Sequence, residues 1–209
     1  MYNHALVSVV VSVFAVAVLA QPPVIIQPGA PGEPSKVLTP DQATDLSQVQ
    51  YTGADIKFMQ GMIGHHTQAL EMVALLQTRT QRADMKKMAE RIRISQEDEI
   101  KMMQGWLAHR GQQVPTGKEH HTHAGMLMPG MLTEDEMKQL ADRTGVAFDK
   151  LFLESMIRHH QGALAMVKDL FAVPGAAQDS DIFAFAADVE ADQSAEIARM
   201  TAMREELGR

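Results

Sequence analysis

The sequence contains no cysteine and few aromatic residues, and both absences limit what the chain can be. None of its 209 residues is cysteine, which excludes disulfides, thiolate metal sites and a cysteine nucleophile. Aromatic residues make up only 5% of the chain, and the clusters typical of strands lie almost entirely in the first 26 residues. We therefore predict an all-α protein.

The chain also lacks a basic excess and the common catalytic motifs. Its formal net charge is −7, so it offers no positive surface to neutralise phosphates, and we expect no nucleic-acid partner. The sequence shows no Ser-His-Asp set, phosphate-binding loop or dinucleotide fingerprint. We therefore expect a binding protein rather than an enzyme.

One apolar run stands near the N-terminus. Residues 5–20 are apolar but too short to span a bilayer comfortably, and they end before Gln21 and two prolines. We predict that residues 1–20 are a cleaved signal peptide and that the mature protein is periplasmic or secreted. Because residues 1–4 contain no lysine or arginine, retention of this segment as a membrane anchor is the alternative.

A linker and a helical domain are expected after this leader. Residues 21–38 are rich in proline and glycine, and we predict a tether without helix or sheet. Thr39, Pro40 and Gln42 form a helix-start signature, which places the beginning of the ordered domain at residue 39 and its end at residue 209.

An internal duplication is the strongest signal in the sequence. Residues 55–73 align without gaps to residues 149–167, and the weaker match downstream pairs Gln96, Glu99, Ile100 and Met103 with Gln193, Glu196, Ile197 and Met200. The matched pairs of the ungapped part are Asp55/Asp149, Phe58/Phe152, Met62/Met156, Ile63/Ile157, His65/His159, His66/His160, Ala69/Ala163, Met72/Met166 and Val73/Val167.

Each half of the duplication predicts a helical hairpin. Apolar residues recur at three- and four-residue spacings, without proline, and predict four long helices over residues 54–77, 81–110, 147–171 and 179–207. The halves 54–110 and 147–208 bury their apolar stripes by packing together as a four-helix bundle. Between them, Thr133 and Glu136 predict a short helix that reaches Arg143 and is closed by Gly145.

Both halves carry the same set of metal-ligand types at the same helical spacing. Each has a methionine three residues before a histidine pair and another seven residues after the first histidine; these residues are Met62, His65, His66 and Met72 in the first half and Met156, His159, His160 and Met166 in the second. Core filling by methionine and hydrogen bonding by histidine is the alternative. Because core filling requires only apolar character, the repetition favours metal binding.

The connector between the halves, residues 111–132, is a second candidate site. It holds six potential ligands, His120, His121, His123, Met126, Met128 and Met131. Thioethers bind Cu(I) well and imidazoles also accept Cu(II), so copper is the predicted metal, with Cu(I) favoured. The alternative is a flexible linker that is rich in histidine by coincidence.

Zinc and iron fit these residues less well than copper. Zinc gains little from methionine, and no Glu-x-x-His motif of di-iron bundles occurs in the four long helices. The acids Asp55, Asp149, Glu99 and Glu196 are expected to orient imidazoles or to pair across helices, with solvated helix faces as the alternative.

Three segments resemble a known family. Residues 58–73, 128–140 and 148–167 are similar to the bacterial "domain of unknown function 305" proteins, which include CopM-like periplasmic copper-binding proteins, and the resemblance extends over residues 55–207. It implies a ferritin-like helical fold, an extracytoplasmic location and copper binding or resistance. The chain departs from the pattern at Leu153, which stands where the first half has Met59, so a second site poorer in sulfur is expected.

These observations predict an exported copper-binding protein for copper sequestration, delivery or resistance. Its expected partners are copper ions and a protein that accepts or exports copper. Two other classes remain open, a metalloenzyme such as a Cu(I) oxidase and a metal-free helical interaction module.

Overall fold

The computed structural model of the chain describes residues 24–27, 34–44, 51–116, 122–123 and 126–208. These residues are mostly helical, with six helices and two small two-stranded sheets. They divide into two units, residues 1–48 and residues 49–209. The predicted signal peptide, residues 1–20, lies outside the described residues. Among the described residues, no helix is long and apolar enough to cross a membrane.

The first unit contains a short hairpin that the sequence pattern did not predict. Strand β1 (Ile25–Gln27) pairs antiparallel with strand β2 (Lys36–Leu38), so the prediction that the linker holds no sheet is wrong. Ile25, Ile26 and Val37 are β-branched, and all the prolines of the segment lie outside the paired positions, where they interrupt no ladder hydrogen bond.

Helix α1 (Pro40–Thr44) begins where the sequence predicts. The Gln42 amide donates to Thr39 Oγ1 at 3.2 Å, and the Thr39 amide donates to Gln42 Oε1 at 3.0 Å. This reciprocal cap satisfies two amide groups that the first turn of a helix otherwise leaves free.

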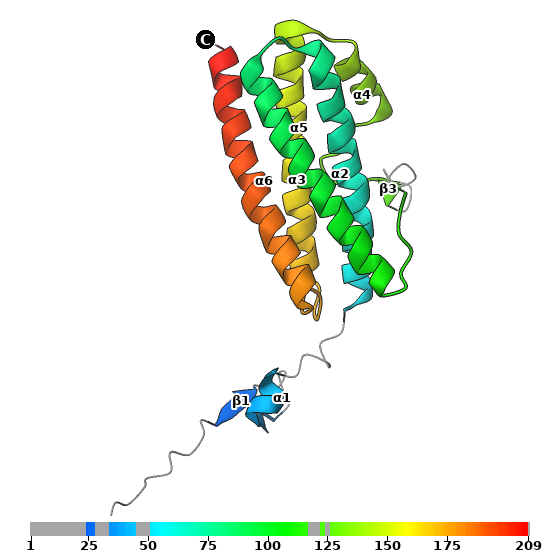
Figure 1. Cartoon of the computed structure of the whole chain (residues 1–209), viewed down its shortest axis with the longest axis vertical. Helices are drawn as coiled ribbons and strands as arrows, with labels where there is room; N and C mark the ends of the chain where they lie inside the picture. Colours follow the sequence, from blue (N-terminus) through cyan, green and yellow to red (C-terminus); the bar gives the residue numbers. More distant parts are fainter. Residues whose placement is uncertain (1–23, 28–33, 45–50, 117–121, 124–125, 209) are drawn as a thin grey trace, which may run out of the picture. The chain divides into compact units, whose positions relative to one another are not determined.

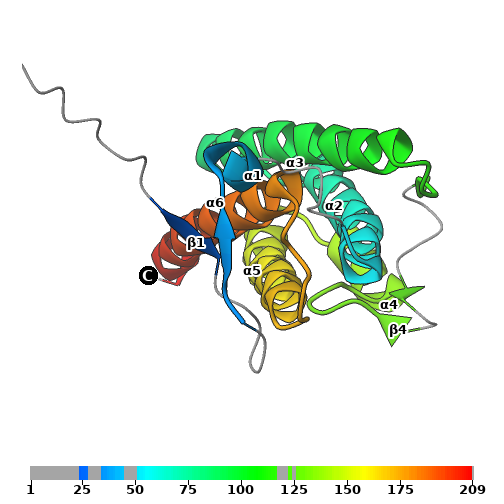
Figure 2. The ribbon, with the colours of Figure 1, turned by 90° about the horizontal axis from the view of Figure 1, so that it is seen from below.

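The second unit is built from four long helices, which run side by side in Figure 1. They are α2 (Gly53–Arg79), α3 (Ala83–His109), α5 (Gly145–Phe171) and α6 (Ser180–Leu207). Helix α2 packs along α3 and α5 packs along α6, and the two hairpins meet where α2 packs against α5, an arrangement seen from below in Figure 2. Two helical hairpins, one from each half of the duplication, therefore form this unit.

The connector contains strands β3 (Thr122–His123) and β4 (Met126–Leu127), and helix α4 (Glu134–Ala141) follows it. The capping box of Thr133 and Glu136 is confirmed. The prediction that Gly145 closes this helix is wrong, because α4 ends at Ala141 and Gly145 is the first residue of α5. Gly145 has φ of +58°, a conformation that glycine adopts without strain, and here it turns the chain into α5.

Two apolar clusters fill the second unit. Residues that the duplication aligns with each other lie in opposite clusters. The first cluster contains Phe58, Met62 and Ile63 of α2, and the second contains their counterparts Phe152, Met156 and Ile157 of α5. The reverse holds for three pairs in which the first-half member lies in the second cluster, Ala69/Ala163, Val73/Val167 and Leu76/Leu170. Helices α2 and α5 are therefore antiparallel, and the halves are related by an approximate two-fold axis.

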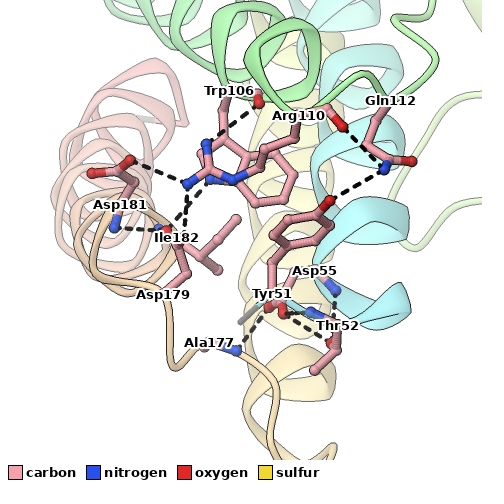
Figure 3. A network of polar contacts seen from close by, with 10 residues as sticks. All are labelled: Tyr51, Thr52, Asp55, Trp106, Arg110, Gln112, Ala177, Asp179, Asp181 and Ile182. Atoms are coloured by element: carbon pink, nitrogen blue, oxygen red, sulfur yellow. Dashed lines mark hydrogen bonds and ion pairs between the residues drawn. The ribbon is translucent and has the colours of Figure 1, made fainter. Parts of the chain in front are cut away.

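A polar network joins the end of α3 to the starts of α2 and α6 (Figure 3). The guanidinium of Arg110 lies 4.3 Å from the ring centroid of Trp106 and 5.6 Å from that of Tyr51. It also donates to Asp179 Oδ2 at 2.7 Å, while Asp179 Oδ1 caps α6 by accepting from the Ile182 amide at 3.3 Å. Cation–π and charged hydrogen bonds thus fix this end of the bundle.

Candidate metal centre

The four helical histidines form one layer between the two apolar clusters. His65 and His66 come from α2 and His159 and His160 from α5, and all four side chains have an exposed fraction of 0%. The rings of His65 and His159 lie with centroids 3.8 Å apart and planes at 40°. The structure therefore brings the two predicted histidine pairs together, and we call these four residues the histidine layer.

A carboxylate from the neighbouring helix holds one imidazole of each pair. His66 Nε2 lies 2.5 Å from Glu99 Oε2, and His160 Nε2 lies 2.6 Å from Glu196 Oε2. Ser95 Oγ also donates to Glu99 Oε1 at 2.8 Å. The expectation that Glu99 and Glu196 orient imidazoles is confirmed. Because a carboxylate accepts, both imidazoles carry hydrogen on Nε2.

The connector supplies the partner of His65. Residues 128–132, which we call the crossing segment, pass over α2 and α5, and His65 Nε2 donates to the Pro129 carbonyl at 3.0 Å. Gln68 fixes the same segment, since its Nε2 donates to the Leu132 carbonyl at 2.9 Å and its Oε1 accepts from the Leu132 amide at 2.8 Å. A single segment of backbone thus contacts both a layer histidine and its helix.

Glycine at position 162 makes room for this segment on α5. A Cβ atom at Gly162 would lie 1.9 Å from the Pro129 carbonyl oxygen and 2.8 Å from Gly130 Cα. The duplication aligns Gly162 with Gln68, so one half binds the crossing segment through a side chain and the other accommodates it by having none. No sequence motif predicted these contacts, although the mismatch between the two aligned positions was visible.

The layer contains imidazole nitrogens without hydrogen-bond partners. Nδ1 of all four histidines and Nε2 of His159 make no hydrogen bond with any residue that the structure describes. Burial, with a smaller contribution from neighbouring imidazoles, lowers the pKa of His65 to about 3 and that of His159 well below its ordinary value. Both rings are therefore neutral at pH 7, and neutral imidazole is the form that binds metal ions.

Glu99 stays ionised in spite of its partial burial. Burial acts to raise its pKa, but hydrogen bonds from His66 and Ser95 and the positive charge that His66 acquires on protonation favour the carboxylate, and the pKa is held below its ordinary value. An ionised carboxylate at this position stabilises either a hydrogen on His66 Nε2 or a cation nearby.

The predicted methionine ligands flank the histidine layer at several positions. Met62 lies in the first cluster and Met72 and Met156 in the second, all with an exposed fraction of 0%, and Met166 packs partly buried against the first cluster. In the connector, Met128 and Met131 are each 5% exposed.

The structure also joins two candidates that the sequence assigned to different sites. Met128 of the connector and Met166 of α5 both approach Gly61, where a Cβ atom would lie 3.2 Å from Met128 Sδ and 3.4 Å from Met166 Cε. The remaining connector candidates are less defined: His120 and His121 lie outside the described residues, and His123 and Met126 are described only as backbone of β3 and β4.

Two predicted acids lie away from the imidazoles. Asp55 caps α2 by accepting from the Thr52 amide at 2.6 Å, and its other oxygen accepts from the Ala177 amide at 2.7 Å in the turn between α5 and α6 (Figure 3). Its counterpart Asp149 is also buried. Of the four acids, Glu99 and Glu196 serve the layer, and Asp55 connects the two hairpins.

Histidine and carboxylate groups alone do not assemble a metal site in this arrangement. Within residues 51–116 and 126–208, as elsewhere in the described chain, no three histidine, aspartate or glutamate side chains are placed to hold one metal ion. The methionine thioethers of the two apolar clusters are further possible donors, and thioethers bind soft ions.

The sequence pattern of a family described as a domain of unknown function, DUF305, matches residues 55–204. The chain belongs to the DUF305 family. No curated protein sequence matches it. Among solved structures, the DUF305 fold of this chain is similar to that of a candidate secreted protein from Streptomyces coelicolor, at 30% identity and a TM-score of 0.65 over 74% of this chain and 94% of that one.

Other solved structures extend this comparison. A DUF305 fragment from Deinococcus radiodurans is 31% identical, with a TM-score of 0.63 over 75% of this chain and 98% of that one. CopM in its Cu(II)-bound form is 28% identical, with a TM-score of 0.59 over 73% of this chain and 96% of that one. CopM structures with Cu(I) and with silver are similar at 28% and 27% identity and TM-scores of 0.57.

Proposed function

We propose that this protein is an exported copper-binding protein that sequesters or delivers copper, or confers resistance to it, without catalytic turnover. The observation that carries the proposal is the histidine layer, in which four buried imidazoles offer Nδ1 atoms that no described residue occupies. A buried polar nitrogen without a partner is costly, and a bound cation would remove that cost. The similarity to CopM structures that contain copper supports the same reading.

The ligands we assign are the methionines and histidines of both halves. The helical set is Met62, His65, His66, Met72, Met156, His159, His160 and Met166, and the connector set is His120, His121, His123, Met126, Met128 and Met131. Thioethers are needed to complete coordination at the helices, which favours Cu(I), while imidazoles also accept Cu(II). Silver in CopM is in keeping with a family site that accepts soft ions.

We further propose that the two hairpins form a ferritin-like four-helix bundle and that the protein acts outside the cytoplasm. The antiparallel packing of α2 against α5 supports the first statement. The similarity to a candidate secreted protein supports the second. A metal-free structural layer is the second candidate, since Glu99 and Glu196 already hold one imidazole of each pair.

A competition titration against a Cu(I) chelator separates the two candidates. Replacing His65, His66, His159 and His160 by glutamine keeps an amide donor for the carbonyl and carboxylate acceptors but removes the Nδ1 lone pairs. We expect the variant to lose a defined share of the bound Cu(I) and most of the Cu(II), while the matched change of the exposed His109 to glutamine has no effect. Parent-like copper binding by the four-histidine variant would leave only the structural role.

A further inference from the structure

Two surface grooves of this protein are related by the duplication. The first, of about 660 Å³, lies between α3 and α6 and includes Glu99, Asp181 and Asp188 in its lining. The second, of about 350 Å³, lies between the same two helices and includes Glu196, Asp84 and Arg91. The alignment that pairs Glu99 with Glu196 also pairs Asp181 with Asp84 and Asp188 with Arg91.

The two grooves have opposite charge character. Four carboxylates and two cationic side chains line the first, which we call the acidic groove: Asp98, Glu99, Asp181, Asp188, Lys101 and Arg110. Two carboxylates and three cationic side chains line the second, the basic groove: Asp84, Glu196, Lys87, Arg91 and Arg199. In the acidic groove, Arg110 is moreover held by Asp179 at 2.7 Å, outside the groove lining, which reduces its effect on a cation there.

Each groove reaches the histidine layer through one carboxylate. The Glu99 side chain is 17% exposed in the acidic groove, and its Oε2 lies 2.5 Å from Nε2 of the wholly buried His66. The Glu196 side chain, 10% exposed, stands in the same relation to His160. His66 Nε2 is thus directed at a carboxylate of the groove lining, and its Nδ1 has no hydrogen-bond partner in the described part of the chain.

We propose that cations reach the histidine layer through the acidic groove, with Glu99 as the last carboxylate on the route, and that the basic groove does not admit them. This inference rests on the proposed copper-binding function. A groove lined mainly by negative charge raises the local concentration of cations and their rate of association, whereas its positive counterpart lowers both. The duplication therefore produced two routes at aligned positions, and charge leaves one of them open.

The test exchanges charge at the paired positions 188 and 91, both exposed in the structure. Association of Cu(II) with the full mature chain is followed at low ionic strength by stopped-flow quenching of the single tryptophan, Trp106. Asp188→Arg should slow association about three- to tenfold, with an effect that shrinks at high salt and an unchanged copper stoichiometry. The double variant Asp188→Arg/Arg91→Asp should recover a rate close to that of the parent, because the open route moves to the second groove.

The matched control is Glu190→Arg, which changes net charge equally on the same helix at an exposed position outside both grooves. It should associate with Cu(II) like the parent. Equal slowing by Glu190→Arg and Asp188→Arg, no slowing by Asp188→Arg, or no recovery in the double variant would overturn the proposed route. Parent-like equilibrium binding by the four-histidine variant would instead overturn the proposed function, so the two failures are distinguishable.

Discussion

Neutral imidazoles in the interior make this protein sensitive to acid. The pKa of His65 is about 3 in the folded protein, whereas an unfolded histidine titrates near 6.5. Between these pH values the unfolded chain binds a proton that the folded chain does not. His65 therefore does not reduce the free energy of unfolding above about pH 6.5, and it reduces this free energy progressively as the pH falls towards 3. His159, with a pKa shifted in the same direction, acts with the same sign.

We therefore predict that the metal-free protein loses about 2 to 3 kcal/mol of unfolding free energy through His65 alone between pH 6.5 and 4.5. His65→Gln keeps a donor for the Pro129 carbonyl and removes the titration, so its pH dependence should be shallower. Urea unfolding at a series of pH values in the presence of a chelator measures this. The exposed His109→Gln variant should follow the parent, and an identical slope in His65→Gln would contradict the assignment.

Gly162 gives a second prediction at the scale of one residue. Gly162→Ala places a methyl group against the backbone of Pro129 and Gly130 and should lower the unfolding free energy by about 3 kcal/mol, since neither helix nor crossing segment can yield easily. Gly105→Ala, in the interior of α3 with no atom within 4 Å of the new Cβ, should instead raise it by about 0.5 to 1 kcal/mol. Thermal unfolding of both variants tests the contrast, which equal shifts would contradict.

At this scale the sequence predicted residue types better than contacts. The repeated histidines and their glutamate partners were visible because both halves keep them at aligned positions. The contact between His65 and the Pro129 carbonyl could not be predicted, because every residue has a carbonyl group and only the path of the chain brings this one to His65. The two buried glutamines Gln96 and Gln193 were aligned as well, and each lies four residues after a buried apolar residue, Ile92 or Val189. Their burial was still not predicted, because glutamine is mostly found exposed.

The crossing segment adds buried methionines that lie outside the helices. Met128 and Met131 are buried against the bundle, and Met126 precedes them in β4. Replacing all three by leucine keeps apolar volume but removes sulfur, so we predict weaker Cu(I) binding in a chelator competition with nearly unchanged helicity by circular dichroism.

The control for this prediction replaces Met85 and Met88 by leucine. These two methionines of α3 are buried in the second apolar cluster and are not among the assigned ligands. Their replacement should leave Cu(I) binding at the level of the parent. Loss of copper in this control, or its retention in the connector variant, would show that methionine content rather than position governs binding.

Helix boundaries were predicted closely where side chains cap them. Thr39 and Thr133 sit at the helix starts that the capping boxes indicated, because these signals depend on residues three positions apart. The hairpin of β1 and β2 was missed, since prolines and glycines between two strands resemble those of an unstructured linker. Gly145 was misassigned because a glycine with positive φ suits the end of one helix and the approach to the next equally well.

At the scale of the whole molecule, export is the remaining prediction from the sequence. We predict that the exported protein begins at or near Gln21 and lacks residues 1–20. Intact-mass measurement of protein recovered from the periplasm or the medium decides this. Recovery of a form that retains Met1 to Ala20 in the membrane fraction would identify the segment as an anchor.

The duplication predicted the arrangement of the whole unit more reliably than any local pattern. Two similar hairpins with one apolar stripe each have few ways to pack, and the observed exchange of residues between the two apolar clusters follows from that similarity. The divergence of the grooves was not foreseen, because it arises from exposed positions such as 91 and 188 that no core requirement constrains.

The crossing segment also makes the two halves of the bundle different. It occurs once and has no two-fold symmetry of its own, so it cannot make the same contacts with both halves. Two identical hairpins on separate chains could form a symmetric dimer in which each hairpin has the same surroundings. Fusion supplies one connector, which binds His65 through Pro129 and leaves His159 without an equivalent bond among the described residues. The two histidine pairs therefore differ in their surroundings, and under the copper-binding function proposed above they are expected to differ in their affinity for the ion.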